Sequence, residues 1–190
     1  MARAKSEDKR LALLSAAIDV FAEEGLSART AKIARRAGVA EGTLFTYFET
    51  KDELFNQLYL HLKGELYQKM IPAYPEQADL KTQVKHIWRA YVEWGVESDN
   101  VRQVMRLLVL SPYLNEQTKA EGTLIFKSQE QLLNRLAVET RLYDYPKDFL
   151  PALIRSSAEM TMDLMLLYPD QAEEYAEAGF ASFWRGICKE

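Results

Sequence analysis

Apolar residues recur at steps of three and four positions along almost the whole chain, which is the spacing of one face of an α-helix. Leu11, Leu14 and Ile18 show this spacing near the N-terminus. No segment alternates apolar and polar residues and then ends at a turn signal, as a half-buried β-strand would. The pattern therefore predicts an all-α fold.

One segment in the first third of the chain has two short runs of helical spacing around a glycine. Thr30 to Ala37 and Glu41 to Phe48 flank Gly38, whose freedom to adopt positive φ suits a tight turn. A longer run precedes them, with Ser6 as the expected N-cap and Gly25 as the C-terminal stop. Three helices in this order predict a helix-turn-helix domain, in which one helix braces and the next enters the major groove of DNA.

The charge of the chain is unevenly distributed. The whole chain has a formal net charge of −4, but residues 1–51 hold nine Lys and Arg against seven Asp and Glu, which leaves −6 for the remainder. A locally basic segment on an acidic chain is expected where one part meets phosphates. The difference is small, so it supports DNA binding only together with the helix-turn-helix pattern.

All 6 Pro residues follow residue 71 and divide the rest of the chain. Proline cannot continue helical hydrogen bonding, so these positions separate the helices that the apolar spacing predicts. A fourth helix is expected from Lys51, and later helices at residues 79–97, 100–110, 115–142, 147–167 and 170–188. The sequence thus predicts about nine helices in total.

The third predicted helix has an apolar face and a polar face. Leu44 and Phe48 fall on the face expected to be buried. Glycine within a helix costs about 1 kcal/mol relative to alanine. Gly42 at the start of this helix therefore suggests that a partner comes close to the backbone there, as a DNA strand would.

Many residues of this part of the chain stand at positions shared by one known family. They are Ala17, Phe21, Gly25, Thr30, Ile33, Ala34, Ala37, Gly38, Val39, Gly42, Thr43, Leu44, Tyr47, Phe48 and Lys51 to Leu54. With these residues the first third of the chain resembles the N-terminal domain of the TetR family of transcriptional regulators. The resemblance implies a DNA-binding domain at residues 1–50 and a helical ligand-binding and dimerisation domain at residues 51–190.

The resemblance also implies which residues contact DNA, mostly at phosphates but at the bases around Gly42. Phe45 departs from the family pattern, in which Tyr is common, because its ring can contact a thymine methyl group but cannot donate to a phosphate. Glu41 either accepts a hydrogen bond from a cytosine amino group or complements the helix dipole. The predicted DNA-binding residues are Thr30, Glu41, Gly42, Thr43, Phe45, Thr46, Tyr47 and Lys51.

Aromatic and Met side chains are frequent after the fourth helix. They suit an adaptable apolar pocket, although each is also common in an ordinary core. Together with the resemblance they predict a cavity for a small-molecule effector that is largely apolar. The candidate lining residues are Trp88, Tyr91, Trp94, Met105, Leu108, Phe126 and Met160.

The last predicted helix combines aromatic residues, which supply buried area, with small residues, which allow close helix approach. In proteins of the TetR family the last two long helices form a four-helix dimer interface, so the resemblance implies a homodimer through residues 147–188. Packing within one chain is the alternative. The candidate interface residues are Tyr175, Gly179, Phe180, Phe183 and Ile187.

No catalytic or metal-binding pattern is visible in the sequence. His61 and His86 have no ligand-spaced Cys, His or carboxylate set, and Cys188 has no evident base partner. The sequence shows neither an apolar run long enough for a membrane span nor a signal peptide, and a single Cys agrees with a reducing compartment. We therefore expect a cytoplasmic protein without enzymatic activity, cofactor or metal.

These features predict a homodimeric repressor that binds a near-palindromic operator in double-stranded DNA and is released by its effector. The alternative is a helix-turn-helix-derived protein-interaction module that does not bind DNA. Phe45 and the acidic balance of the chain would support that alternative.

Overall fold

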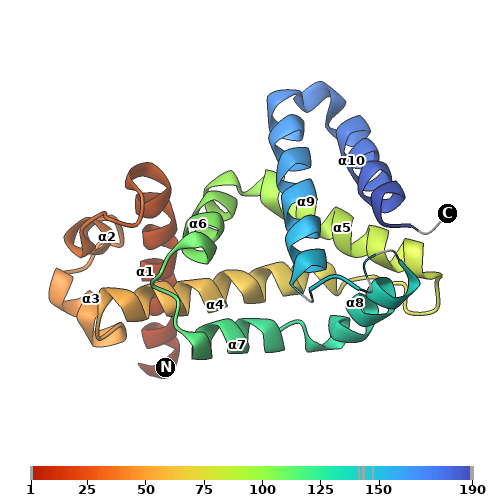
Figure 1. The fold of residues 1–190 in the computed structure, drawn as a ribbon. Coiled ribbons are helices and arrows are strands. Elements are labelled where there is room, and N and C mark those ends of the chain that lie inside the picture. The colour runs from red at the N-terminus through yellow and green to blue at the C-terminus, as the bar shows by residue number, and fades with distance from the viewer. Residues whose placement is uncertain (1, 141, 143, 147, 189–190) are drawn as a thin grey trace. The chain divides into compact units, whose positions relative to one another are not determined.

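The computed structural model describes residues 2–140, 142, 144–146 and 148–188, and within them the regular elements are helices. The prediction of an all-α fold is confirmed. The helices, labelled in Figure 1, are α1 (Ala2–Glu24), α2 (Thr30–Arg36), α3 (Glu41–Tyr47), α4 (Lys51–Met70), α5 (Leu80–Glu97), α6 (Asp99–Leu110), α7 (Glu116–Leu124), α8 (Lys127–Glu139), α9 (Phe149–Leu167), the short 3-10 helix η1 (Pro169–Gln171) and α10 (Ala172–Ile187).

The chain divides into two compact units that alternate along the sequence. The first comprises Met1–Gly64 and Ser98–Leu124, and the second comprises Glu65–Glu97 and Ile125–Glu190. Helix α4 passes through the boundary, so its first part belongs to one unit and its last part to the other. The sequence predicts a domain boundary after residue 50. In the structure the first compact unit continues to Gly64 and also includes α6 and α7. The assignment of residues 1–50 to DNA binding stays a prediction.

Aromatic rings from α1, α4 and the segment after α6 meet in the core of the first unit. The ring centroids of Phe21 and Phe55 are 5.2 Å apart, and Phe55 stacks on Tyr113 at 4.9 Å. Leu14, which the apolar spacing places on the inner face of α1, is fully buried, whereas Leu11 is 40% exposed. The apolar stripe of α1 thus enters the core at Leu14 rather than at Leu11.

A buried polar side chain joins α4 to the loop between α6 and α7. Asn56 donates through Nδ2 to the carbonyl oxygen of Tyr113 at 3.0 Å, and its Oδ1 accepts from the amide of Asn115 at 3.1 Å. A Cβ atom on Gly122 would stand 2.6 Å from the ring of Tyr59, so α7 approaches α4 too closely for a side chain unless that ring moves. These contacts hold α7 within the first unit.

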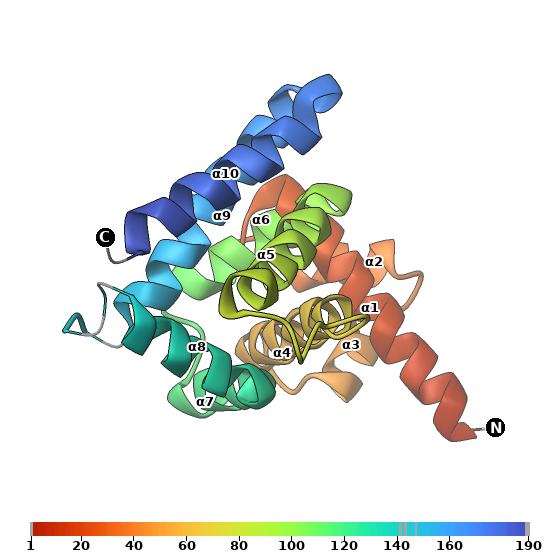
Figure 2. The same ribbon diagram turned by 90° about the vertical axis from the view of Figure 1, so that its right-hand side faces the viewer.

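In the second unit α9 and α10 lie side by side, and α5 packs against both (Figures 1 and 2). Trp88 of α5 stacks on Phe183 of α10 with ring centroids 5.4 Å apart. A Cβ atom on Gly179 would stand 2.8 Å from Cγ2 of Thr161 on α9 and closer still to its Oγ1. The apolar stripe of α10 is therefore covered by helices of the same chain.

Ion pairs connect α5 and α10 at the edge of this packing. Arg89 lies 2.6 Å from the Glu173 carboxylate and 2.9 Å from that of Glu177, and Lys85 lies 2.7 Å from Glu177. The hydrogen bond from Arg89 lowers the pKa of Glu173, and the hydrogen bond from Lys85 lowers the pKa of Glu177. Hydrogen bonding to Glu173 raises the pKa of Arg89 in turn.

Two helix boundaries differ from those that the sequence predicts. Helix α1 begins at Ala2, ahead of the expected cap at Ser6. The helix expected over residues 115–142 is two helices, α7 and α8, and its break after Leu124 coincides with the boundary between the compact units. No Gly or Pro stands at that break, so apolar spacing alone could not show it. The expected helix start at Lys147 lies outside the described residues.

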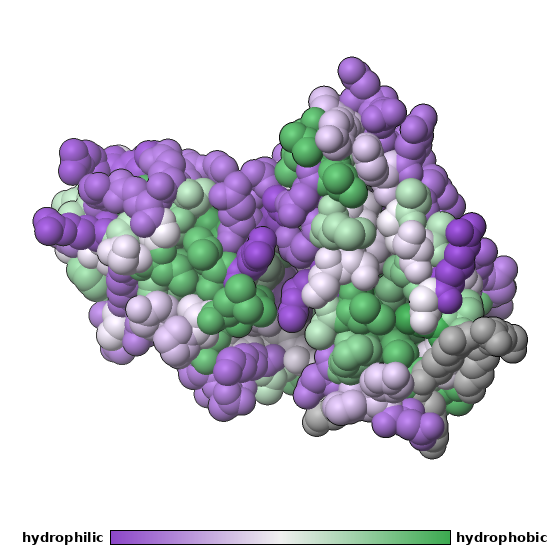
Figure 3. All heavy atoms as spheres, turned by 45° about the horizontal axis from the view of Figure 1, so that its top comes forward, coloured by the Kyte–Doolittle hydropathy of each residue, from purple (hydrophilic) through white to green (hydrophobic). Residues whose placement is uncertain are grey.

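Hydrophobic side chains also lie on the surface of both units. Figure 3 shows them as green patches within a largely hydrophilic surface. Leu110 of α6 is 72% exposed, and Leu167 at the end of α9 is 66% exposed. Exposed apolar patches are common where a protein meets a partner.

Among the helices that the structure describes, none combines the length and apolar composition required to cross a lipid bilayer.

Candidate nucleic-acid interface

Helices α2 and α3 are joined by a short turn that contains Gly38. This residue has a φ of 71°, in the left-handed region that favours glycine. The amide of Val39 donates to the carbonyl oxygen of Ala34 at 3.0 Å, which closes the end of α2. Ile33 and Leu44 are fully buried and anchor one face of each helix. The predicted helix-turn-helix arrangement is therefore present.

The opposite face of α3 is open. Gly42, Phe45 and Thr46 are exposed, and Phe45 keeps 42% of its surface accessible although it is aromatic. Thr43 and Tyr47 are half-buried at the edges of this face. Among the described residues, no atom outside the local backbone lies within 4 Å of the place where a Cβ atom on Gly42 would stand. The structure leaves this face free for a partner.

A hydrogen bond joins the starts of α2 and α3. Thr30 donates through Oγ1 to Oε1 of Glu41 at 2.7 Å. A hydroxyl group has one proton to donate, so in this arrangement Thr30 does not also donate to a phosphate. The sequence identifies both residues as candidates for DNA contact, but not their contact with each other, because eleven positions separate them.

Lys51, the first residue of α4, is held by the protein itself. Its Nζ donates to the carbonyl oxygen of Ala28 at 2.6 Å. The same atom lies 5.9 Å from the ring centroid of Phe21 and 5.4 Å from that of Phe55. Burial lowers the pKa of Lys51. An ammonium group has three protons, so the bond to Ala28 does not prevent Lys51 from also donating to a phosphate. The phosphate contact stays a prediction.

Acidic residues of α1 compensate basic residues of α2. Nζ of Lys32 lies 2.7 Å from the Glu24 carboxylate, and the Arg36 guanidinium lies 2.6 Å from that of Glu23. The hydrogen bond with Arg36 lowers the pKa of Glu23, and it raises the pKa of Arg36. Arg35 is exposed on the same helix. Part of the positive charge counted in the sequence is therefore neutralised within the unit.

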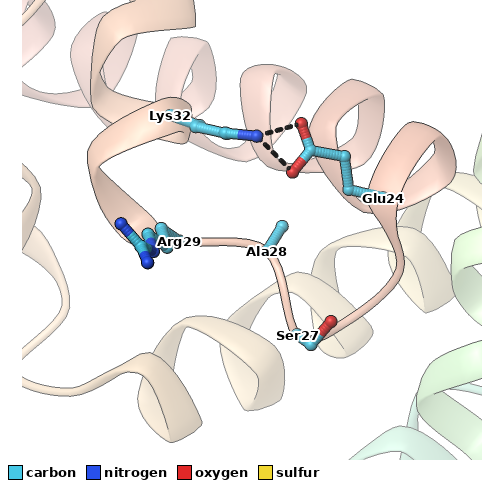
Figure 4. A pocket seen from close by; sticks show the side chains of 5 residues that line it. All are labelled: Glu24, Ser27, Ala28, Arg29 and Lys32. Carbon is cyan, nitrogen blue, oxygen red and sulfur yellow. Dashed lines mark hydrogen bonds and ion pairs between the residues drawn. The ribbon is translucent and has the colours of Figure 1, made fainter.

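A shallow hollow lies beside the start of α2. It has a volume of about 380 Å³ and is lined by Glu24, Ser27, Ala28, Arg29 and Lys32. Figure 4 shows the ion pair of Lys32 and Glu24 along one side, with the Arg29 guanidinium directed away from it. None of these residues is a predicted effector contact.

No group of three His, Cys, Asp or Glu side chains in the described part of the chain is placed to hold a metal ion.

Comparisons with known proteins agree with this geometry. Residues 13–58, which include α2 and α3, match the family of bacterial regulatory proteins named tetR. A crystal structure assigned to that family, from Shewanella sp. PV-4, superposes with a TM-score of 0.84 over 96% of this chain and 99% of the other, at 25% identity. The N-terminal helices of this chain therefore belong to the TetR family of transcriptional regulators.

A regulator protein of Bacillus subtilis and a further crystal structure are also similar to this chain. A fatty acid metabolism regulator protein of Bacillus subtilis (strain 168) is 34% identical over 74 residues, which are 38% of this chain and 38% of that protein. The crystal structure of FadR from Bacillus subtilis in complex with stearoyl-CoA has a TM-score of 0.69 at 19% identity, over 92% and 97% of the two chains. The first likeness spans little more than a third of either chain, and the second shows the fold alone.

The residues predicted to line an effector cavity are distributed over both compact units. Met160 is 52% exposed on α9, so it does not line a cavity enclosed within its own unit. The effector cavity itself stays a prediction. The remaining candidates are divided between the units, with Met105 and Leu108 in the first and Trp88, Tyr91, Trp94 and Phe126 in the second.

The residues predicted for the dimer interface mostly face the chain's own core. Phe180, Phe183 and Ile187 are 3%, 5% and 0% exposed, and Gly179 is buried against α9. These four have almost no surface left for a second copy, so the choice of residues is corrected. The strongest apolar stripe of α10 is already covered by α5 and α9. Tyr175 is half-buried.

Proposed function

We propose that this protein is a DNA-binding transcriptional repressor. The observation that carries the proposal is the open face of α3, with Gly42, Phe45 and Thr46 exposed opposite the buried Leu44. A helix presented in this way, with a second short helix bracing it, is how helix-turn-helix proteins enter the major groove. Because the operator lies on chromosomal DNA, we expect the protein to act in the cytoplasm.

The residues of this face have different roles in the proposed complex. Gly42 lets the backbone approach the base edges, because no side chain stands there. Phe45 packs against a thymine methyl group or a sugar, since its ring has no donor. Thr43 and Tyr47, at the edges, donate hydroxyl protons to phosphates, which fixes the position of the protein on the duplex.

A mobility-shift assay with the DNA upstream of the protein's own gene tests this function. The wild-type protein should retard the fragment at low salt, and Thr46→Glu should abolish retardation through repulsion from the phosphates. Thr123→Glu is the matched control, because both residues are exposed and both donate to a carbonyl oxygen one turn earlier, at 3.2 Å and 3.0 Å. Equal binding by Thr46→Glu and wild type would contradict the proposal.

The second candidate function is a protein-interaction module that does not bind DNA. The compensation of Lys32 and Arg36 by acidic residues of α1 favours it, because it reduces the positive charge available to phosphates. Absence of retardation of any DNA by the wild-type protein at low salt would support this candidate over the repressor.

The proposal includes a homodimer formed through the outer faces of α9 and α10. Phe149, Met160 and Leu167 are 43%, 52% and 66% exposed, and their spacing of about three and about two helical turns places them on one side of α9. Ala178 and Ser182 are exposed one turn apart on α10 and are short enough for close helix approach. A second copy of this chain would cover both faces.

A two-fold dimer makes a geometric prediction about the operator. Each α3 would enter one half-site, so the operator is near-palindromic, with half-sites about one helical turn or a multiple of it apart. Light scattering coupled to size exclusion should give twice the chain mass of 21.9 kDa. A mass of one chain at micromolar concentration would contradict the dimer.

The proposal also includes release of the repressor by a largely apolar small molecule. Trp88 and Trp94 of α5 are buried, and Nε1 of Trp88 has no hydrogen-bond partner among the described residues. A buried donor without a partner costs about 1–3 kcal/mol, so an effector oxygen that reached it would bind favourably. The relative FadR, of the same fold, binds stearoyl-CoA.

Stearoyl-CoA is therefore the first effector to test. It should quench or shift the tryptophan fluorescence and reverse the retardation of operator DNA, whereas coenzyme A without the acyl chain should do neither. Coupling of this kind requires that the effector bind the DNA-free form more tightly than the DNA-bound form. Retardation that persists at saturating stearoyl-CoA would reject this class of effector.

A further inference from the structure

The carboxylate of Glu41 is fixed at one oxygen and open at the other. Oε1 accepts the hydroxyl proton of Thr30 at 2.7 Å. Glu41 is exposed, and among the described residues Oε2 has no hydrogen-bond partner. Because Thr30 begins α2 and Glu41 begins α3, the bond connects the two helices of the motif. It restrains the rotation of the Glu41 side chain before any partner arrives, which reduces the entropy lost on binding.

An uncompensated carboxylate is unfavourable on a surface that faces DNA, because phosphates repel it. Two neighbouring acids of the first unit are compensated differently, since Glu23 pairs with Arg36 and Glu24 with Lys32. Glu41 is held instead by a neutral hydroxyl group, which leaves its negative charge in place. Complementing the dipole of α3 does not require the bond to Thr30. The bond therefore points to a role for the orientation of the carboxylate.

The chemistry of the base edges restricts what this carboxylate can bind. A carboxylate accepts hydrogen bonds and donates none. In the major groove guanine presents two acceptors and thymine one, and adenine places the N7 acceptor beside its N6 donor. Cytosine presents its N4 amino donor alone. We propose that Oε2 of Glu41 accepts a hydrogen bond from a cytosine amino group in each operator half-site. This inference rests on the proposed DNA binding and adds a base preference to it.

Thr30 is the positioning residue for this contact. Its single hydroxyl proton goes to Glu41, so it orients the carboxylate instead of binding a phosphate. Thr30→Val keeps the branched shape of the side chain and removes the donor. The loss should weaken the preference for cytosine more than it weakens the affinity for unrelated DNA, which depends on phosphate contacts.

Selection from randomised double-stranded DNA with the full-length protein tests the inference. The wild type should enrich cytosine at one position of each half-site by about tenfold over the other bases. Glu41→Gln should shift that position towards adenine, because a glutamine amide bonds to N6 and N7 of adenine together. Thr30→Val should retain cytosine with a preference reduced to about threefold.

Glu49→Gln is the matched control, because it removes the same charge from an exposed glutamate just beyond α3. It should leave the preference at the cytosine position unchanged. An unchanged far-UV circular dichroism spectrum and retained binding of unrelated DNA at low salt show that each variant is folded. Equal cytosine enrichment by wild type and Glu41→Gln, with DNA still bound, overturns this inference and leaves the proposed function intact. Failure of the wild type to retain any DNA overturns both.

Discussion

Replacing Lys51 by methionine tests how the start of α4 is held to the turn between α1 and α2. Methionine keeps an unbranched apolar chain and removes the ammonium group, with its hydrogen bond to Ala28 and its contacts with two aromatic rings. A hydrogen bond from a charged donor contributes about 1.5–3 kcal/mol, and a cation over a ring about 0.5–1 kcal/mol where it is partly exposed. Burial disfavours the charged form, as the lowered pKa of Lys51 shows, and offsets part of this. We expect Lys51→Met to lower the free energy of unfolding by about 1–2 kcal/mol.

Urea unfolding followed by circular dichroism measures this loss. Lys119→Met is the control, because Lys119 forms an exposed ion pair with Glu116 at 2.7 Å, and such pairs contribute at most about 1 kcal/mol. The control should therefore lose less stability than Lys51→Met. An unfolding free energy of Lys51→Met equal to that of the wild type would refute the internal role assigned to the ammonium group.

The same variant also tests the predicted phosphate contact of Lys51. If the ammonium group binds a phosphate in each subunit, the variant binds all sequences more weakly. The slope of log affinity against log salt concentration then falls by about 0.9 for each contact. An unchanged slope would assign Lys51 to the internal contacts alone.

Three further predictions concern helix packing, dimer formation and the pH dependence of stability. Gly179→Ala should lower the free energy of unfolding by about 1–3 kcal/mol, because its Cβ atom would collide with α9, whereas Gly64→Ala, with open space around it, should raise it by about 0.5–1 kcal/mol. Leu167→Asp should convert the proposed dimer to a monomer in light scattering, and a retained dimer would place the interface elsewhere. The pKa values of Glu173 and Glu177 are lowered in the folded chain, so their contribution to stability is complete at neutral pH and is lost as the pH falls through the folded-state values. The double variant with Gln at both positions should therefore lose less stability than the wild type between about pH 5 and pH 3, and equal losses would contradict this.

The helix-turn-helix could be predicted because its features are local. The apolar positions Ile33 and Leu44 follow helical periodicity within each short helix, and both are buried. Gly38 has the positive φ that the turn requires. The same local reasoning could not show that Thr30 bonds to Glu41, because that contact joins two helices and depends on how they pack.

The last helices show the opposite case. The apolar stripe of α10 is visible in the sequence, but a stripe does not reveal what covers it. Phe180 and Phe183 could have faced a second copy, and the structure packs them against α5 instead. Met160 is similarly a cavity candidate by residue type, and its 52% exposure on α9 is visible only in the structure. The break between α7 and α8 follows the boundary between compact units, which no residue marks.

The sequence by itself determined the helical class, the glycine turn at residue 38 and the family, because each depends on residues a few positions apart. Only the tertiary structure decided the partners of Lys51, Glu41 and the α10 stripe. Each of these contacts joins segments distant in the chain, and periodicity carries no information about which of several apolar or charged surfaces will meet. The open face of α3, on which the proposed function rests, is the result of both.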